Sequence, residues 1–379
     1  MRAEAVVAGH TCLDIIPEWT HRSGLELLPG TITHVGPAGI ATGGCMPNTG
    51  LALGRLGVRT RLVGKVGQDE FGQLVRELLE RRGRHMEVRL LPSPGEHTSY
   101  SVILNPPQID RVVLHYPGTN DTFTSRDLPS DALAGARLLH FGYPPIMRAM
   151  YEDGGRELEE LLRRAKELGL TTSLDMAYPD PDSPAGRADW PSILERALPW
   201  TDVCVPSIGE ILLMLGQPQG VVTPERVRGV GARLLEMGAA IAGVKLGERG
   251  LYLRTAGEER LGRAGPALTA RGEWACRELW ANVFEVQVVG TTGAGDATMA
   301  GLLMALLRGL PPEEALTAAC AVGACSVEAP DATSGIPSWQ EIEARVRAGW
   351  PRQRRSPGPG WAETRTPGVW RGPDDVTNR

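Results

Sequence analysis

Short apolar runs alternate with helical patterns along most of this chain. The stretch 69–82 shows the helical type, because Phe71, Leu74 and Leu78 recur at the spacing that places side chains on one helix face. Repeated strand–helix units give crossover connections between parallel strands, so the alternation predicts a doubly wound three-layer α/β/α sandwich. The predicted strands are 5–9, 61–66, 138–141, 171–175, 203–206 and 241–245, and the predicted helices are 48–56, 69–82, 155–168, 193–198 and 226–237.

Two regions interrupt this alternation in the first third of the chain. Residues 99–104 and 111–116 are strand-like runs on either side of Asn105-Pro106-Pro107, which is typical of a hairpin. The stretch 15–42 is rich in Gly, Pro and Thr and has an extended pattern. We expect the segments at about 15–42 and 87–118 to form a small sheet that projects from the main body as a lid.

The rest of the chain is assigned to one domain over 1–349 and a tail. Residues 258–284 contain Gly-rich turns and two tryptophans, and we interpret them as a surface insertion. Residues 350–379 are dense in Pro, Gly and Arg without a helical or strand period. They are expected to form an irregular tail, poorly ordered or lying on the surface.

Composition excludes several classes of partner. The net charge is -5, which gives no reason to expect nucleic acid or an anionic membrane. None of the six cysteines forms a C-x-x-C pair, so we expect reduced thiols. No signal-peptide pattern or long apolar run is present, which favours a cytoplasmic protein.

The stretch Thr291-Thr292-Gly293-Ala294-Gly295-Asp296 is the clearest chemical signal. It joins an apolar run at 286–289, expected to be a strand, to a small-residue helix expected over 297–307. A glycine-rich turn that opens a helix offers unpaired N–H groups and a positive dipole end to an anion. Asp296 adds a carboxylate, which suits phosphoryl transfer to a hydroxyl. The alternative is that Asp296 only caps the helix.

Three motifs in order resemble the PfkB, or ribokinase-like, family of carbohydrate and nucleoside kinases. The first is Gly43-Gly44 followed by Asn48 and Arg55-Leu56-Gly57, the second is the block from Gly64 to Gly72, and the third is Thr291 to Asp296. The resemblance covers about residues 5–345. It implies a ribokinase-like sandwich with a small β-sheet lid, and ATP-dependent phosphorylation of a sugar, sugar acid or nucleoside hydroxyl with Mg²⁺.

The resemblance also assigns roles around the reacting groups. Asp296 would act as general base, and the N–H groups of Gly293, Ala294 and Gly295 would form the anion hole. The substrate cradle would be made by four residues, which are Asp14, Gly43, Gly44 and Asn48. An ordinary tight turn for the glycine pair, and a turn or cap role for Asp14, are the alternatives.

Further positions resemble the nucleotide and metal side of the family site. Glu210 would act on Mg²⁺ through water, with Ser207 where the family has an Asn. Alternatively, Glu210 is a solvated helix residue. Lys245 would add charge toward the phosphates, although a strand-end lysine that reaches solvent is the alternative. The remaining positions assigned to nucleotide binding are Gly247, Gly250 and Cys320.

Departures from the family pattern limit these assignments. Gly290 stands where an Asp linked to a monovalent cation is common, which argues against activation by potassium. Cys45 and Gly142-Tyr143 replace residues of the ribose-specific set, which argues against ribokinase itself. A non-catalytic sugar- or nucleotide-binding protein on the same fold is the alternative function. The exposed sheet of the lid could also pair two copies into a homodimer.

Overall fold

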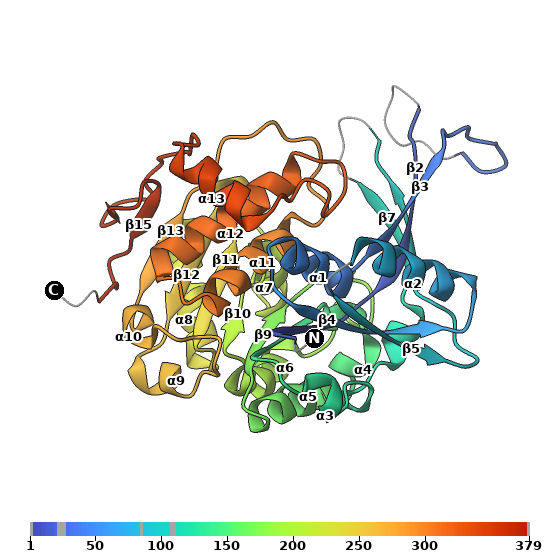
Figure 1. The fold of residues 1–379 in the computed structure, drawn as a ribbon, viewed down its shortest axis with the longest axis horizontal. Coiled ribbons are helices and arrows are strands. Elements are labelled where there is room, and N and C mark those ends of the chain that lie inside the picture. The colour runs from blue at the N-terminus through green and yellow to red at the C-terminus, as the bar shows by residue number, and fades with distance from the viewer. Residues whose placement is uncertain (1–2, 21–27, 84–85, 107–110, 377–379) are drawn as a thin grey trace.

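A large sheet covered by helices on both faces forms the body of the molecule, and a small sheet projects from one end (Figure 1). The computed structural model describes residues 3–20, 28–83, 86–106 and 111–376. The large sheet has the strand order β14-β15-β13-β12-β11-β10-β9-β8-β1-β4-β5. Its strands are β1 (Ala5–Gly9), β4 (Thr60–Gly67), β5 (Glu87–Ser93), β8 (Leu138–Gly142), β9 (Thr171–Asp175), β10 (Val203–Cys204), β11 (Ile241–Lys245), β12 (Leu251–Thr255), β13 (Glu278–Ala281), β14 (Ala362–Glu363) and β15 (Val369–Arg371).

The pairing along this sheet changes once from parallel to antiparallel, between β11 and β12. The strands from β5 to β11 run parallel, whereas β12, β13, β15 and β14 are joined by antiparallel pairing. The parallel part confirms the prediction from the strand–helix alternation. Because parallel strands are covered on both faces, they are nearly continuous apolar runs, such as the fully buried β1.

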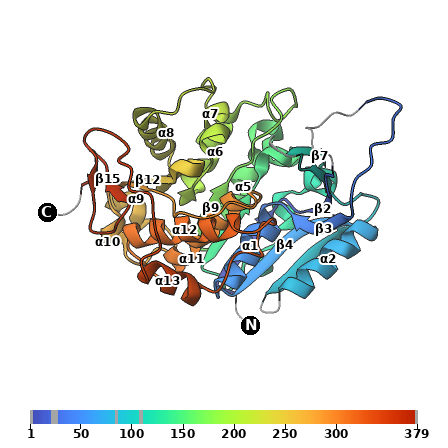
Figure 2. The same cartoon turned by 90° about the horizontal axis from the view of Figure 1, so that it is seen from above.

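Helices cover both faces of the large sheet (Figure 2), and the buried apolar residues form two cores, one on each face. The first packs α1 (Cys45–Arg55), α2 (Glu70–Arg82), α11 (Ala294–Leu307), α12 (Pro312–Val327) and α13 (Trp339–Arg347). The second packs α5 (Arg156–Glu167), α6 (Trp190–Ala197), α7 (Ile208–Met214) and α8 (Pro224–Glu236). The shorter helices are α3 (Ser130–Leu133), α4 (Arg148–Tyr151), α9 (Glu258–Gly262) and α10 (Arg271–Trp274). The three-layer architecture is therefore confirmed. Within the described ranges, no helix is long and apolar enough to cross a membrane.

The small sheet has the order β3-β2-β6-β7 and forms the lid. Its strands are β2 (Cys12–Pro17), β3 (Ala38–Gly43), β6 (Tyr100–Leu104) and β7 (Val112–Tyr116). The predicted hairpin is confirmed, because β6 pairs antiparallel with β7. Residues 21–27 and 107–110 of the expected lid lie outside the described residues.

The register of the lid sheet separates a polar face from an apolar face. Asp14 pairs with Ser101, and Ser101 pairs with His115, so these three side chains form one row across three strands. The neighbouring row points to the opposite face, because successive strand residues alternate. That row is Ile40, Ile15, Val102 and Leu114.

Four sequence expectations about the elements differ from the structure. Residues 87–93 are not part of the lid but form β5 at the edge of the large sheet, where they pair with β4. The stretch 258–284 is not a surface insertion throughout, because β13 is fully buried in the large sheet. The tail adds β15 to β13 and buries Val369. Strands this short have no visible period. Residues 286–289 form no strand, and Val288 and Val289 are exposed.

Candidate active site

The glycine turn opens α11 as the sequence predicts. Gly293 has φ 74°, the left-handed conformation that glycine adopts at little cost, and a Cβ there would lie 2.3 Å from the Ala332 Cβ. The helix begins at Ala294, whose N–H also donates to the Thr291 carbonyl at 3.3 Å. The N-terminus of α11 therefore directly follows the glycine turn, and Asp296 lies in the first turn of the helix.

Asp296 is almost completely buried, at 2% exposure. Its carboxylate accepts hydrogen bonds from the Asn48 Nδ2 at 3.0 Å, the Thr49 hydroxyl at 3.3 Å and the Tyr143 hydroxyl at 2.8 and 2.9 Å. Burial and the neighbouring Asp175 carboxylate together raise the pKa of Asp296 to about 6, although the Asn48 donor opposes the rise. These bonds join Asp296 to other elements, so it is not a simple helix cap.

Lys245 lies beside the same turn and forms a buried ion pair. Its Nζ is 2.7 and 2.8 Å from the two oxygens of Asp175, and a Cβ on Gly295 would lie 3.3 Å from that Nζ. Burial disfavours the ammonium, but the carboxylates of Asp175 and Glu210 raise the pKa of Lys245 above its usual value. The side chain does not reach solvent as the alternative proposed. Sequence reasoning missed Asp175, although its place at the end of a parallel strand is a signal for a site residue.

A cavity of about 890 Å³ opens between the lid and the body above Asp296. Three of the four predicted substrate residues line it, namely Asp14, Gly44 and Asn48. There is a steric reason for glycine at positions 43 and 44. A Cβ on Gly43 would lie 2.1 Å from the Asp14 carboxylate, and one on Gly44 would lie 2.4 Å from the His10 Nδ1. The two glycines therefore allow Asp14 and His10 to pack against the backbone of the cradle.

The polar row of the lid lines the same cavity through a hydrogen-bonded series. His115 Nδ1 lies 3.1 Å from the Ser101 hydroxyl, and its Nε2 lies 3.2 Å from the His10 Nε2. The Cys12 thiol donates to Asp14 at 3.3 Å. Burial raises the pKa of Asp14 to about 6 and lowers the pKa of His115 to about 4. The imidazoles were missed from the sequence because their pairing depends on the register of the lid.

The lid also contacts the glycine turn before α11 directly. Arg111, just before β7, donates from Nη1 to the Thr292 hydroxyl at 2.6 Å. Arg148 on α4 lines the cavity from the body. Asn120 and Cys45, by contrast, do not line this cavity. Asn120 donates to the Thr11 carbonyl and accepts from its N–H, and Cys45 lies 3.2 Å from the His140 Nε2.

Glu210 and Ser207 begin α7 and cap each other. Glu210 Oε2 accepts from the Ser207 N–H at 2.6 Å, and the Ser207 hydroxyl accepts from the Glu210 N–H at 3.4 Å. Glu210 nevertheless lines the large cavity, and burial raises its pKa to about 7, opposed by Lys245. Ser207 is therefore occupied as a cap, whereas Glu210 faces the site.

The remaining predicted nucleotide residues lie outside the cavity that contains Asp296, as far as the described chain shows. Gly247 and Gly250 bound a tight turn between β11 and β12, and a Cβ on Gly250 would lie 1.9 Å from the Ala281 carbonyl. The Cys320 thiol on α12 is directed at the same carbonyl at 3.8 Å. The structure thus places Gly250 and Cys320 together at the Ala281 carbonyl, with Gly247 in the adjoining turn, rather than in the cavity that contains Asp296.

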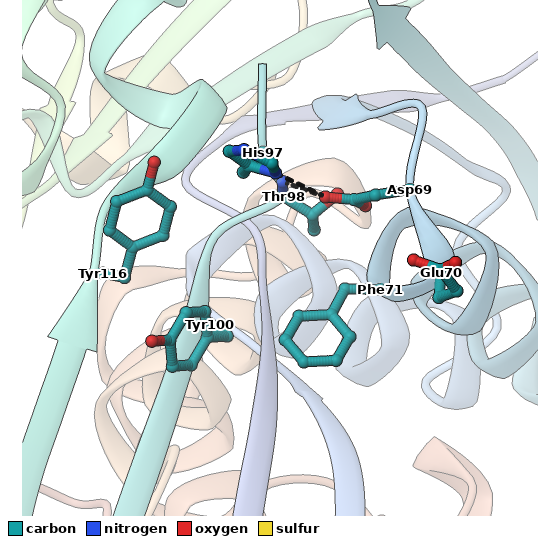
Figure 3. Close-up of a pocket in the computed structure, with 7 residues that line it drawn as sticks. All are labelled: Asp69, Glu70, Phe71, His97, Thr98, Tyr100 and Tyr116. Carbon is teal, nitrogen blue, oxygen red and sulfur yellow. Dashed lines mark hydrogen bonds and ion pairs between the residues drawn. The ribbon is translucent and has the colours of Figure 1, made fainter. Parts of the chain in front are cut away.

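A smaller pocket of about 360 Å³ lies between α2 and the lid (Figure 3). Asp69 accepts from the N–H of Gly72 and from the N–H and hydroxyl of Thr98. Its carboxylate therefore caps α2 and holds the lid segment to the body. The motif from Gly64 to Gly72 has this structural role and does not line the larger cavity.

Comparisons with known proteins agree with this geometry. The family model for pfkB family carbohydrate kinases matches residues 2–339. The 2-dehydro-3-deoxygluconokinase of Bacillus subtilis is 27% identical over 80% of this chain and 86% of its own length. The nucleoside kinase of Methanothermobacter thermautotrophicus is 26% identical over 92% of this chain and 96% of its own. An Escherichia coli protein in complex with ATP and Mg²⁺ has the same fold, with a TM-score of 0.69 and 21% identity over 91% of this chain and 99% of its own.

Proposed function

Because the chain belongs to the PfkB family of carbohydrate kinases, we propose that it transfers the γ-phosphoryl group of ATP to a hydroxyl of a sugar, sugar acid or nucleoside, with Asp296 as the general base. The observation that carries this proposal is the position of Asp296. It is a buried carboxylate with a pKa of about 6, in the first turn of a helix, and it lines the large cavity between the lid and the body. A base with a pKa near neutrality can accept a proton and still be ionised at working pH.

The proposed steps assign one task to each part of the site. Asp14 and Asn48 orient the acceptor, Asp296 takes the proton from its hydroxyl, and the 293–296 turn faces the charge that develops on the transferring phosphoryl group. The N-terminus of α11 adds its dipole to this turn. Arg111 brings a lid cation to the same place, so closure of the lid would exclude water.

Mg²⁺ would be held on the Glu210 side of the cavity. Among the described residues, no group of three or more His, Cys, Asp or Glu side chains could enclose a metal ion. This suits Mg²⁺, which keeps several waters and is usually held by one or two carboxylates and substrate phosphates. When bound, the ion would neutralise phosphate charge. Glu210 fits a water-mediated contact because it faces the cavity.

The acceptor is proposed only as a class. Relatives of this chain include a 2-dehydro-3-deoxygluconokinase and a nucleoside kinase, so sugar acids and nucleosides are both supported. The cavity contains donors for either class, because Arg111 and Arg148 can bind a carboxylate, and His10 and the lid residue His115 can contact hydroxyl groups.

A lid-to-lid homodimer is also proposed. The apolar face of the lid leaves Ile40 at 44% exposure and Leu114 at 55%. Both belong to the row that faces away from the cavity. A second copy of the same face would cover this row, and an isologous contact is the commonest way to do so.

The substitution Asp296→Asn tests the proposed base. It should lower kcat by about 10²–10⁴-fold, because an amide cannot accept the proton, while the acceptor still binds. The measurement is ATP consumption across a panel of sugars, sugar acids and nucleosides. In the unmodified protein, kcat/KM should fall below about pH 6, where Asp296 becomes protonated. Asp131→Asn, at an exposed carboxylate, is the control. Near-normal turnover of Asp296→Asn would remove Asp296 from the mechanism.

A further inference from the structure

Tyr143 is the unexpected partner of the base. It follows β8 directly and has φ 70° and ψ 39°, a left-handed conformation that is unfavourable for a residue with a Cβ. Its hydroxyl points at the middle of the Asp296 carboxylate, 2.9 Å from Oδ1 and 2.8 Å from Oδ2. A strained residue held against a base, in a cavity, indicates a functional constraint.

The contacts of Asp296 leave little room for an acceptor. Asn48 takes one position on Oδ2 and Thr49 takes one on Oδ1, and both donors come from the buried helix α1. Asp296 as a whole is only 2% exposed. An acceptor hydroxyl that is to lose its proton to Asp296 therefore has to occupy the position that the Tyr143 hydroxyl holds.

The Tyr143 side chain also has free space beside it and a neighbouring ring that connects it to the lid. Its side chain lines the large cavity, so the ring borders open space. The centre of the ring lies 6.1 Å from that of His10, and His10 contacts His115 of the lid at 3.2 Å. A change in lid position would reach the tyrosine through two neighbouring rings.

We propose that the Tyr143 hydroxyl is a removable stand-in for the acceptor hydroxyl, which covers the base until substrate displaces it. The inference rests on the proposed function, because it takes Asp296 as the base. Water is the competing acceptor in a kinase, and the covered base cannot activate water. Tyr143 is thus a positioning residue that favours transfer to substrate over hydrolysis of ATP.

The test is Tyr143→Phe, which keeps the ring and removes only the hydroxyl. Hydrolysis of Mg–ATP without any acceptor should rise by about tenfold, the order expected for loss of a hydrogen bond to a charged group. KM for the best acceptor of the panel should fall. The acid limb of kcat/KM should move to higher pH, because the Tyr143 donor lowers the pKa of Asp296. The charged and titratable groups that face Asp296 besides Tyr143 are Asp175, Lys245 and Cys45.

Two further variants separate this inference from the proposed function. Tyr100→Phe removes a tyrosine hydroxyl from the smaller pocket and should leave acceptor-free hydrolysis unchanged. In Tyr143→Phe/Asp296→Asn the extra hydrolysis should disappear, whereas Asp296→Asn alone decides whether Asp296 is the base. Unchanged hydrolysis in folded Tyr143→Phe would overturn the inference, as would a loss of kcat above tenfold at constant KM.

Discussion

The body side of the cavity, here called the floor, is formed around Asp296 by α1 and the start of α11, whereas the lid carries Asp14. These two carboxylates lie in different surroundings. Asp296 in the floor is fixed by donors from α1, a helix whose residues from Cys45 to Leu53 are all buried. Asp14 in the lid accepts a hydrogen bond from the Cys12 thiol. The lid sheet that carries it also contains β7, whose residues are half-buried or exposed. The floor therefore has a single rigid arrangement, which phosphoryl transfer requires.

The lid has fewer buried contacts and more freedom to change. The strand register alone keeps the side chains of Asp14, Ser101 and His115 on the face of the lid sheet that lines the cavity. Side chains along that face can vary without disturbing the core of the body. We infer that the floor determines the reaction and the lid determines the acceptor. The following variants test this division.

Lys245→Met should have the largest effect on the floor. It leaves the Asp175 carboxylate buried at 0% side-chain exposure without its ion-pair partner. Breaking a buried pair in this way typically costs about 3–5 kcal/mol of unfolding free energy. The measurement is urea unfolding, together with turnover, since the positive charge beside Gly295 is lost as well.

Lys245→Met/Asp175→Asn separates the two roles of the lysine. Removing both charges should recover most of the stability, because an uncompensated buried charge no longer remains. Turnover should stay low if the Lys245 charge serves the anion-binding turn. Full recovery of turnover in the double variant would show that the pair has only a structural role.

Asp14→Asn, in the lid, should have a smaller effect on the enzyme than the Lys245 variants. KM for the acceptor should rise by about tenfold or more, the order for a hydrogen bond to a charged group, while kcat changes little. Stability at pH 8, unlike acceptor binding, should not decrease in this variant. The pKa of Asp14 is raised to about 6, so the folded state binds more protons than the unfolded state between about pH 4 and 6. Stability due to Asp14 therefore falls as pH rises through that window.

At pH 8 the ionised Asp14 thus destabilises the fold, and Asp14→Asn should unfold at an equal or higher temperature than the unmodified protein. Thermal unfolding at pH 8 and steady-state kinetics on the same sample check both effects. A fall in kcat to the level of Asp296→Asn would contradict the division between floor and lid.

Leu114→Glu should act on assembly alone. It places a charge in the apolar row on the outer face of the lid and should convert a dimer to a monomer. Val221→Glu, at a residue that is 83% exposed on the body, is the matched control. Sedimentation equilibrium gives the oligomeric state. A monomeric unmodified protein at micromolar concentration would rule out the proposed dimer.

Much of this floor was predictable from the sequence. The strand–helix period indicated the parallel sheet, and the turn before α11 indicated Asp296, because both are local patterns. The Lys245–Asp175 pair and the Tyr143 contact were not predictable. The first joins the ends of two separate strands, and the second joins the residue after β8 to the first turn of α11. The strands β13, β14 and β15 are too short to show alternation and form by pairing at the sheet edge.

The smallest effect is expected from potassium. Gly290 offers no carboxylate, and its Cα lies against the backbone carbonyls of Ala329 and Pro330, with a Cβ there at 3.0 and 3.1 Å from those oxygens. The permanent charge of Lys245 already lies beside the turn at Gly295. Replacing K⁺ with tetramethylammonium at constant ionic strength should therefore change kcat by less than about twofold, well under the effect of one ordinary hydrogen bond. Gly290→Asp would introduce the missing carboxylate, and a gain of K⁺ dependence in that variant would show that the floor lacks only this group.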